Sequence, residues 1–183
     1  MKNSFKIILI SLTILYPFIV FVGIKSLSLK YIGLLIALLF CLRSLIIKDK
    51  NIIWKVICIM GVVLAITAAL INNIIVMQLY PIFVNIILFG IFSYSLFQEK
   101  SIITKFAERV NKLPLPTYAI KYTWCVTFSW CIFFCLNALV STFTVFGSIE
   151  IWTLYNGLIS YLLIGLLATI EIIIRFFIRR QFR

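Results

Sequence analysis

The most constraining feature of this chain is the segment from Tyr122 to Phe146, which holds 25 consecutive residues without a charged side chain. At 1.5 Å per residue, a helix of that length extends about 37 Å. The hydrocarbon core of a membrane is about 30 Å thick. A single segment within hydrocarbon satisfies its backbone hydrogen bonds only as a helix. The segment therefore predicts a transmembrane helix and an all-α fold.

Polar and aromatic side chains recur along this segment at intervals of three and four residues. Residues at that spacing share one helix face, and lipid offers their hydroxyl and amide groups no hydrogen bonds. We expect this face, the polar seam, to lie against other helices. The favoured interpretation is a packing seam, and the alternative is a groove for a ligand or an ion. The polar seam comprises Thr123, Thr127, Trp130, Phe134, Asn137, Ser141 and Thr144.

The composition of the whole chain places the other segments in the same class. Of the 183 residues, 64% are hydrophobic and 12% are charged, and the mean hydropathy is +1.19. These proportions indicate a membrane protein rather than a soluble domain. The net charge of +12 does not indicate nucleic-acid binding, because the basic residues stand at the ends of apolar runs, where membrane orientation requires them. Histidine, the commonest general base and metal ligand, is absent.

Six apolar runs are long enough to form the transmembrane helices of a single bundle. Pro17 lies inside the first run and should kink it, leaving a backbone carbonyl for a neighbouring group to satisfy. Arg43 stands near the end of the second run, where its long side chain can reach the membrane surface. The six runs cover residues 7–24, 29–47, 52–71, 77–97, 122–146 and 151–175.

Small residues in two of these runs predict where helices approach closely. Ala65, Ala68 and Ala69 lie in the third run, and Gly157 and Gly165 lie in the last. Small side chains at a membrane helix interface let two backbones come together. We therefore expect tight helix contacts at these positions.

The basic residues indicate how the spans are oriented. With both termini in the cytoplasm, 15 of the 17 Lys and Arg residues fall on the inner side, and only Lys25 and Lys30 lie outside. Inner loops of membrane proteins carry such an excess of positive charge. We therefore expect a multi-pass protein with cytoplasmic N and C termini.

The connection between the fourth and fifth spans contains a predicted amphipathic helix at residues 101–113, with Ser101 as its N-cap. One interpretation places this helix flat on the inner leaflet, where anionic headgroups attract its cations. The other packs its apolar face beneath the bundle. The basic residues expected at the membrane surface are Lys105, Arg109 and Lys112.

Glu171 is the acid placed well inside a predicted span, and Arg175 follows one helical turn later as its natural partner. An acid within a membrane is a candidate functional residue. Its position beside a cation near the cytoplasmic end favours a structural ion pair instead. Asn156 of the same span and Asn137 of the fifth span are candidates for a hydrogen bond across the bundle.

The five cysteines all lie within predicted spans, and their odd number argues against a disulfide framework. Cys131 and Cys135 share a helix face, but no histidine or acid nearby completes a metal site. We expect packed thiols, with no metal and no cofactor.

The motifs of the C-terminal half resemble those of small bacterial inner-membrane proteins. A basic amphipathic loop, the sequence LPLP at 113–116 and the sequence WCIFF at 130–134 follow one another. A proline-bearing loop followed by W-x-x-F-F resembles the intracellular septation protein family.

The last span is similar to a second group, whose members are uncharacterised membrane proteins encoded beside acyl-carrier-protein and ketosynthase genes in aryl-polyene-type lipid clusters. The similarity rests on WTLYNG at 152–157, SYLL at 160–163 and Glu171 followed by Arg175. Together the two resemblances cover roughly residues 95–180. They imply a multi-pass protein of the inner membrane.

The resemblance implies a non-enzymatic accessory or scaffold in envelope biogenesis, acting in lipid synthesis, cell-wall synthesis or septation. The expected partners are the lipid bilayer with anionic lipids at its inner leaflet, other membrane proteins of envelope synthesis, and a second copy of the chain. Nucleic acid is not expected. The alternative is a small transport component or substrate-binding membrane subunit. A membrane acyl or prenyl transferase is disfavoured, because the paired aspartates and the His-x4-Asp motif of such enzymes are absent.

Overall fold

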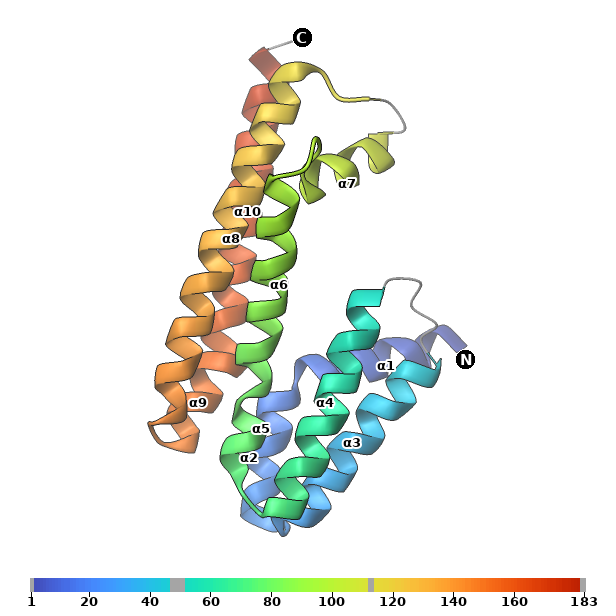
Figure 1. The fold of residues 1–183 in the computed structure, drawn as a ribbon, viewed down its shortest axis with the longest axis vertical. Helices are drawn as coiled ribbons and strands as arrows, with labels where there is room; N and C mark the ends of the chain where they lie inside the picture. The colour runs from blue at the N-terminus through green and yellow to red at the C-terminus, as the bar shows by residue number, and fades with distance from the viewer. Residues whose placement is uncertain (1, 47–51, 112–113, 182–183) are drawn as a thin grey trace. The chain divides into compact units, whose positions relative to one another are not determined.

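The computed structural model describes residues 2–46, 52–111 and 114–181, and the regular structure of these ranges is helical (Figure 1). Within these described ranges, five helices are long and apolar enough to cross a membrane, or six if a bent pair near the N-terminus forms one span. The chain is therefore an all-α multi-pass membrane protein. The helices are α1 (Lys2–Ile14), α2 (Tyr16–Ser26), α3 (Leu29–Ile46), α4 (Ile52–Ile71), α5 (Ile74–Gln78), α6 (Tyr80–Leu96), α7 (Ile102–Asn111), α8 (Thr117–Val145), α9 (Ile149–Leu154), the π-helical turn η1 (Tyr155–Ile159) and α10 (Ser160–Gln181).

The helices pack into two compact units. The first unit comprises Met1–Ile82 and Ser141–Tyr161, and the second comprises Phe83–Val140 and Leu162–Arg183. The unit boundaries fall inside α6, α8 and α10, so each of these helices contributes residues to both units. Each unit has a buried centre of its own.

The predicted first span, residues 7–24, is broken into α1 and α2, whose directions differ by 71°. The break falls at Leu15, and Pro17 follows in the first turn of α2. Proline has no N–H to continue the hydrogen bonds of the preceding helix. The carbonyl of Ile14, at the end of α1, accepts the hydroxyl of Tyr161 at 2.8 Å. The predicted kink is confirmed, and the Ile14 carbonyl at the break has a side-chain partner.

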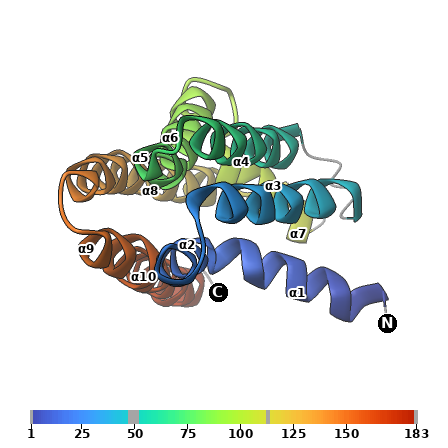
Figure 2. The ribbon, with the colours of Figure 1, turned by 90° about the horizontal axis from the view of Figure 1, so that it is seen from below.

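In the first unit, α3 and α4 run side by side (Figures 1 and 2). Gly33 allows this approach, because a methyl group there would lie 2.6 Å from both the carbonyl oxygen of Ala65 and the Cβ of Ala69. Ala65, Ala68 and Ala69 are all buried. The predicted close contact at the three alanines is confirmed.

Aromatic rings fill the centre of the first unit. The ring centroid of Tyr16 lies 4.9 Å from that of Tyr80 and 6.4 Å from that of Trp152. The polar atoms of these rings bond backbone carbonyls: the Tyr16 hydroxyl donates to Met77 at 2.6 Å, and the Trp152 indole donates to Gln78 at 3.2 Å. The aromatic cluster comprises Tyr16, Phe40, Tyr80 and Trp152, which come from α2, α3, α6 and α9.

The fourth span begins earlier than its predicted start at residue 77. The backbone of Asn72 is left-handed, with φ of 55°, and the side chain of Asn73 accepts the N–H of Ile75 at 2.9 Å. These two asparagines turn the chain and cap α5, so helical structure starts at Ile74. The predicted end of the second span, residue 47, lies outside the described residues.

The last two spans also differ from prediction. Helix α8 starts at Thr117 rather than 122, directly after Pro116, which ends the extended connection. The predicted span 151–175 is interrupted by η1, which contains Gly157. A methyl group at Gly157 would lie 2.7 Å from the Phe18 ring, whereas one at Gly165 meets no described atom within 4 Å. Close approach is therefore confirmed at Gly157, and the prediction for Gly165 is wrong.

The second unit contains α7 with most of α6, α8 and α10. Phe92 of α6 packs edge-on against Phe134 of α8, with ring centroids 5.1 Å apart. The largest fully buried side chains of the described residues include Thr104 and Thr127 from this unit. Hydroxyl groups, rather than large rings, therefore occupy its most enclosed positions.

Candidate functional site

In the second unit, the polar seam meets α7 through hydroxyl groups. Thr127 Oγ1 donates to Ser101 Oγ at 2.9 Å, and the hydroxyl oxygens of Thr104 and Thr123 lie 2.7 Å apart. Ser101 and Thr104 also bond each other at 2.9 Å. All four residues are buried. Each hydroxyl thus has a partner within the protein, as buried polar groups require.

This contact determines which side of α7 faces the protein. Helix α7 covers Ile102–Asn111 of the predicted range 101–113, and the Thr104 N–H donates to Ser101 Oγ at 3.4 Å, as expected of an N-cap. Ala107 is buried, but Phe106 and Val110 are 61% and 65% exposed. The apolar face of α7 therefore packs beneath the bundle at Ala107 but not at Phe106 and Val110, so the packing interpretation holds for only part of this face.

Asn137, the amide of the polar seam, is buried and donates from Nδ2 to Asn85 Oδ1 of α6 at 3.0 Å. Asn85 is buried as well. An amide pair of this kind satisfies two polar groups that lipid would leave unbonded. The sequence suggested Asn156 as the partner of Asn137, and the structure provides Asn85.

Further along α8, the polar seam continues within the first unit. Ser141 Oγ donates to Asn156 Oδ1 at 2.7 Å, and Asn156 Nδ2 donates to Thr144 Oγ1 at 3.2 Å and to the Trp152 carbonyl at 3.0 Å. Ser141, Thr144 and Asn156 are buried. The amide of Asn156 thus joins α8 to the helix that contains Trp152.

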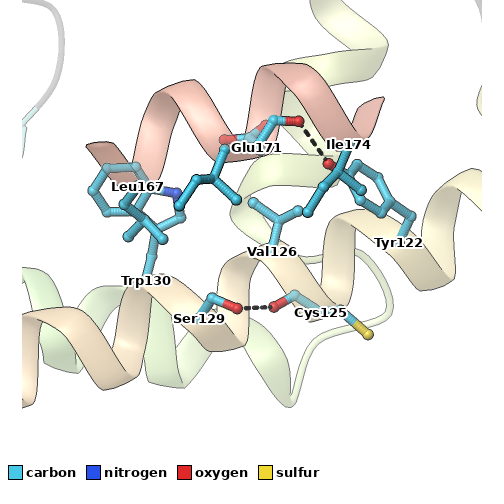
Figure 3. A pocket seen from close by; sticks show the side chains of 9 residues that line it. Tyr122, Cys125, Val126, Ser129, Trp130, Leu167, Glu171 and Ile174 are labelled. Atoms are coloured by element: carbon cyan, nitrogen blue, oxygen red, sulfur yellow. Dashed lines mark hydrogen bonds between the residues drawn. The ribbon is translucent and has the colours of Figure 1, made fainter. Parts of the chain in front are cut away.

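Trp130 departs from the rest of the polar seam, because it is half-buried and lines a shallow groove between α8 and α10 (Figure 3). The groove has a volume of about 170 Å³. Small-molecule sites usually enclose about 300–1,000 Å³, so the groove is suited to one bulky side chain or part of a lipid tail. Its lining is Tyr122, Cys125, Val126, Ser129, Trp130, Leu167, Ile170, Glu171 and Ile174.

Glu171 and Arg175 form an ion pair beside this groove. The side chain of Glu171 is 14% exposed and that of Arg175 is 36% exposed. The Tyr122 hydroxyl donates to the backbone carbonyl of Glu171 at 2.9 Å, which ties α8 to α10 (Figure 3). The predicted pairing of Glu171 with Arg175 is confirmed. The carboxylate that lines the groove is therefore balanced by a neighbouring cation.

Lys105 and Arg109 are exposed on α7, next in sequence to the exposed apolar residues Phe106 and Val110. Lys112, the third basic residue expected at the membrane surface, lies outside the described residues. The exposed part of α7 therefore combines apolar and basic side chains.

Glu108 is the acid of α7, and its carboxylate pairs with Lys100 at 2.9 Å and accepts the N–H of Leu115 at 3.3 Å. The hydrogen bond from Lys100, followed by that from Leu115, holds the pKa of Glu108 below its ordinary value. The Glu108 carboxylate thus bonds Lys100, which precedes α7, and Leu115, which follows it. It does not offset the charges of Lys105 and Arg109.

Arg43 does not extend its side chain into solvent as the prediction of a reach to the membrane surface implies, because it is only 8% exposed and is enclosed by the protein. Phe40 and Ile36 are buried on the same helix. Their spacing to Arg43, three and seven residues, places all three on one face. That register with buried apolar residues was the sequence signal for burial.

The described residues contain no group of three or more histidine, cysteine or acidic side chains that could hold a metal ion. Cys131 is buried and Cys135 is exposed, and both have free thiols. The expected packing is therefore confirmed for Cys131 and wrong for Cys135, and the expected absence of a metal stays a prediction.

Comparison with known proteins adds no relative from which a function could be transferred. No family model, no curated protein and no solved structure matches this chain.

Proposed function

We propose that this chain is a non-enzymatic inner-membrane protein that acts as an accessory or scaffold in envelope biogenesis. The observation that carries the proposal is the internal bonding of the polar seam: Thr127 bonds Ser101, Asn137 bonds Asn85, and Ser141 bonds Asn156. A site for a polar solute turns a few polar groups toward its ligand. These groups instead hold helices of the same chain together.

The partner surface in this proposal is the groove lined by Trp130 and Glu171. A half-buried tryptophan and a partly desolvated ion pair have the character of anchors in protein interfaces. Lipid tails are as apolar as leucine, so membrane helices associate through close packing rather than hydrophobicity. The fitting partner is a transmembrane helix of an envelope-synthesis protein that inserts one bulky apolar side chain into the groove.

Helix α7 supplies the second surface of the proposal. Phe106 and Val110 enter the boundary of the inner leaflet, and Lys105 and Arg109 lie at its anionic headgroups. This arrangement requires α7 to lie on the cytoplasmic side of the membrane, where the distribution of basic residues predicts it. The inner-membrane location and the envelope pathway rest on the sequence resemblance of residues 95–180.

The proposal is tested by filling the groove and measuring function in a deletion strain. Ser129 is exposed and lines the groove, so Ser129→Phe should block the partner side chain without disturbing the buried seam. Leu136→Phe, at an exposed position of the same helix outside the groove lining, is the matched control. We expect Ser129→Phe to fail in complementation while keeping the wild-type melting temperature. Leu136→Phe should complement normally.

A photocrosslinking residue identifies the partner directly. Placed at position 129 in native membranes, it should capture one envelope-synthesis protein, and the same residue at position 136 should not. If Ser129→Phe complements while a stable Asn137→Leu protein does not, the scaffold proposal fails and a solute site at the seam is the better account.

A further inference from the structure

Arg43 is a cation withdrawn from solvent inside a helix that is long and apolar enough to cross a membrane. Its Nε atom has no hydrogen-bond partner among the described residues, and no described carboxylate forms an ion pair with it. Withdrawing an ionised group from water is unfavourable where one of its hydrogen-bond donors stays unpaired. A charged residue inside a membrane protein therefore marks a functional site by default.

The described surroundings of Arg43 supply an aromatic ring but no anion. The guanidinium lies over the ring of Trp54, 5.4 Å from its centroid, in the first turn of α4, and this cation–π contact compensates the charge only in part. Lys55 follows in the same turn, and the first turn of a helix carries partial positive charge. Within the described residues of the first unit the acid is Glu150, which interacts electrostatically with Lys25 instead.

We infer that Arg43 is the centre of a binding site for a phosphate group, and that its occupant is the phosphodiester of a membrane phospholipid. The planar donors of arginine match two phosphate oxygens at once. Arg43 lies in the last turn of α3, which ends at Ile46, so a spanning α3 brings it to headgroup depth. Trp54 is suited to the same depth, where tryptophan gathers in membrane proteins.

Trp54 supplies a second contact for a lipid. Trp54 is 43% exposed, so its ring also offers an apolar surface to an acyl chain. This site belongs to the first unit and does not depend on the scaffold role or on the groove of the second unit.

The test measures phospholipid binding to the full-length protein purified in a maltoside detergent, which contains no phosphate. Native mass spectrometry with added phosphatidylglycerol gives the number and affinity of bound lipids. We expect one lipid to bind the wild type, and Arg43→Gln to weaken this binding by about tenfold or more, as for loss of a charge-assisted pair. Lys30→Gln, an equal change of charge at an exposed residue of the same helix, should bind as the wild type.

Two further arms separate the sources of the anion. The melting temperature of the wild type is measured with inorganic phosphate alone and with phosphatidylglycerol. An equal rise with both would assign the site to a free phosphate ion and contradict the proposal of a lipid. Asp49 is the remaining acid of the N-terminal segment. If Asp49→Asn lowers the melting temperature of the wild type but not that of Arg43→Gln, the chain neutralises Arg43 itself and the inference fails.

If Arg43→Gln does not fold, Arg43→Lys, which keeps the positive charge, replaces it in the binding measurement. Lysine offers a single point charge in place of the two-pronged contact. Its affinity for phosphatidylglycerol should fall between those of the wild type and Arg43→Gln. An affinity equal to that of the wild type would argue against recognition of a phosphate by the guanidinium.

Discussion

The two units bury their polar groups in different ways. In the first unit, large rings fill the centre, and the polar atoms of Tyr16 and Trp152 bond the backbone carbonyls of the buried residues Met77 and Gln78. In the second unit, the enclosed positions hold small hydroxyls such as those of Thr104 and Thr127. One unit therefore depends on packed volume, and the other depends more on short side-chain hydrogen bonds.

The glycines repeat this contrast. A methyl group at Gly33 or Gly157 of the first unit would collide with neighbouring atoms, whereas one at Gly90 or Gly165 of the second meets none of the described atoms within 4 Å. Hydrophobicity does not drive helices together in lipid, so packing and hydrogen bonds must do so. The first unit should consequently be sensitive to changes of volume, and the second should be more tolerant.

The largest expected effect is that of Trp152→Ala in the first unit. Trp152 is fully buried, so the truncation should cost about 3–5 kcal/mol of stability, as in soluble cores. Trp124→Ala is the matched change in the second unit, where the ring is 43% exposed. Thermal unfolding in detergent should show a much larger loss for Trp152→Ala. Equal losses would break the contrast between the units.

Adding one methyl group tests the close packing of α3 on α4. Gly33→Ala should destabilise the protein by about 1–3 kcal/mol, because overpacking forces the backbones apart. Gly90→Ala, in open space, should instead stabilise its helix by about 0.5–1 kcal/mol, since alanine loses less conformational freedom than glycine. Opposite shifts of the melting temperature are expected. Stabilisation by Gly33→Ala would show that α3 and α4 are not close-packed.

The ion pair of the second unit should have a moderate effect. Glu171→Gln leaves the Arg175 charge without its partner and should cost about 1–2 kcal/mol, less than for a fully buried pair. The expected loss of stability is smaller because the Arg175 side chain is 36% exposed. The double variant Glu171→Gln, Arg175→Gln should cost less than either single change. If Glu171→Gln keeps its stability but abolishes complementation, the carboxylate is a functional group and the structural interpretation is wrong.

The smallest effect is expected at the amide pair. Asn137→Leu removes the bond to Asn85, and such bonds within membranes average about 0.6 kcal/mol. Asn85→Leu should cost a similar amount, and the double variant should cost little more than either alone. A loss above about 2 kcal/mol for Asn137→Leu would mean that the second unit depends on this bond as strongly as the first depends on its rings.

Composition and residue type were sufficient to predict much of the fold. The apolar runs locate the candidate spans, Pro17 locates the break, and Ala65 locates a close contact, because each is a local property of the chain. The polar seam also followed from spacing along a single helix. What could not be predicted is which partner each seam residue meets, as with Asn137 and Asn85, because that depends on other helices.

Two residues were placed wrongly for physical reasons. Trp130 shares the seam's spacing but lines the groove half-buried, whereas Phe134, the other large ring of the seam, is buried against Phe92 of α6. Arg43 was expected to reach the membrane surface because long cations usually do. The spacing of Arg43 from Ile36 and Phe40, which places it on the buried face of α3, outweighed that tendency.

The turn η1 changes the direction in which side chains after it point, relative to those before it. In an α-helix, Trp152 and Tyr161 would point about 180° apart, because each residue advances by 100°. Both nevertheless meet the broken first span, Trp152 at the Tyr16 ring and Tyr161 at the Ile14 carbonyl. In η1 the Ser160 N–H bonds the Tyr155 carbonyl, five residues earlier, so this turn is wider than an α-helical turn. The rotation about the helix axis between Trp152 and Tyr161 is therefore smaller, and both side chains lie closer to one side. Straightening this turn into a regular α-helix of the same length would turn Tyr161 away from Ile14, whereas deleting one residue would restore a regular helix and leave Tyr161 about 80° from Trp152.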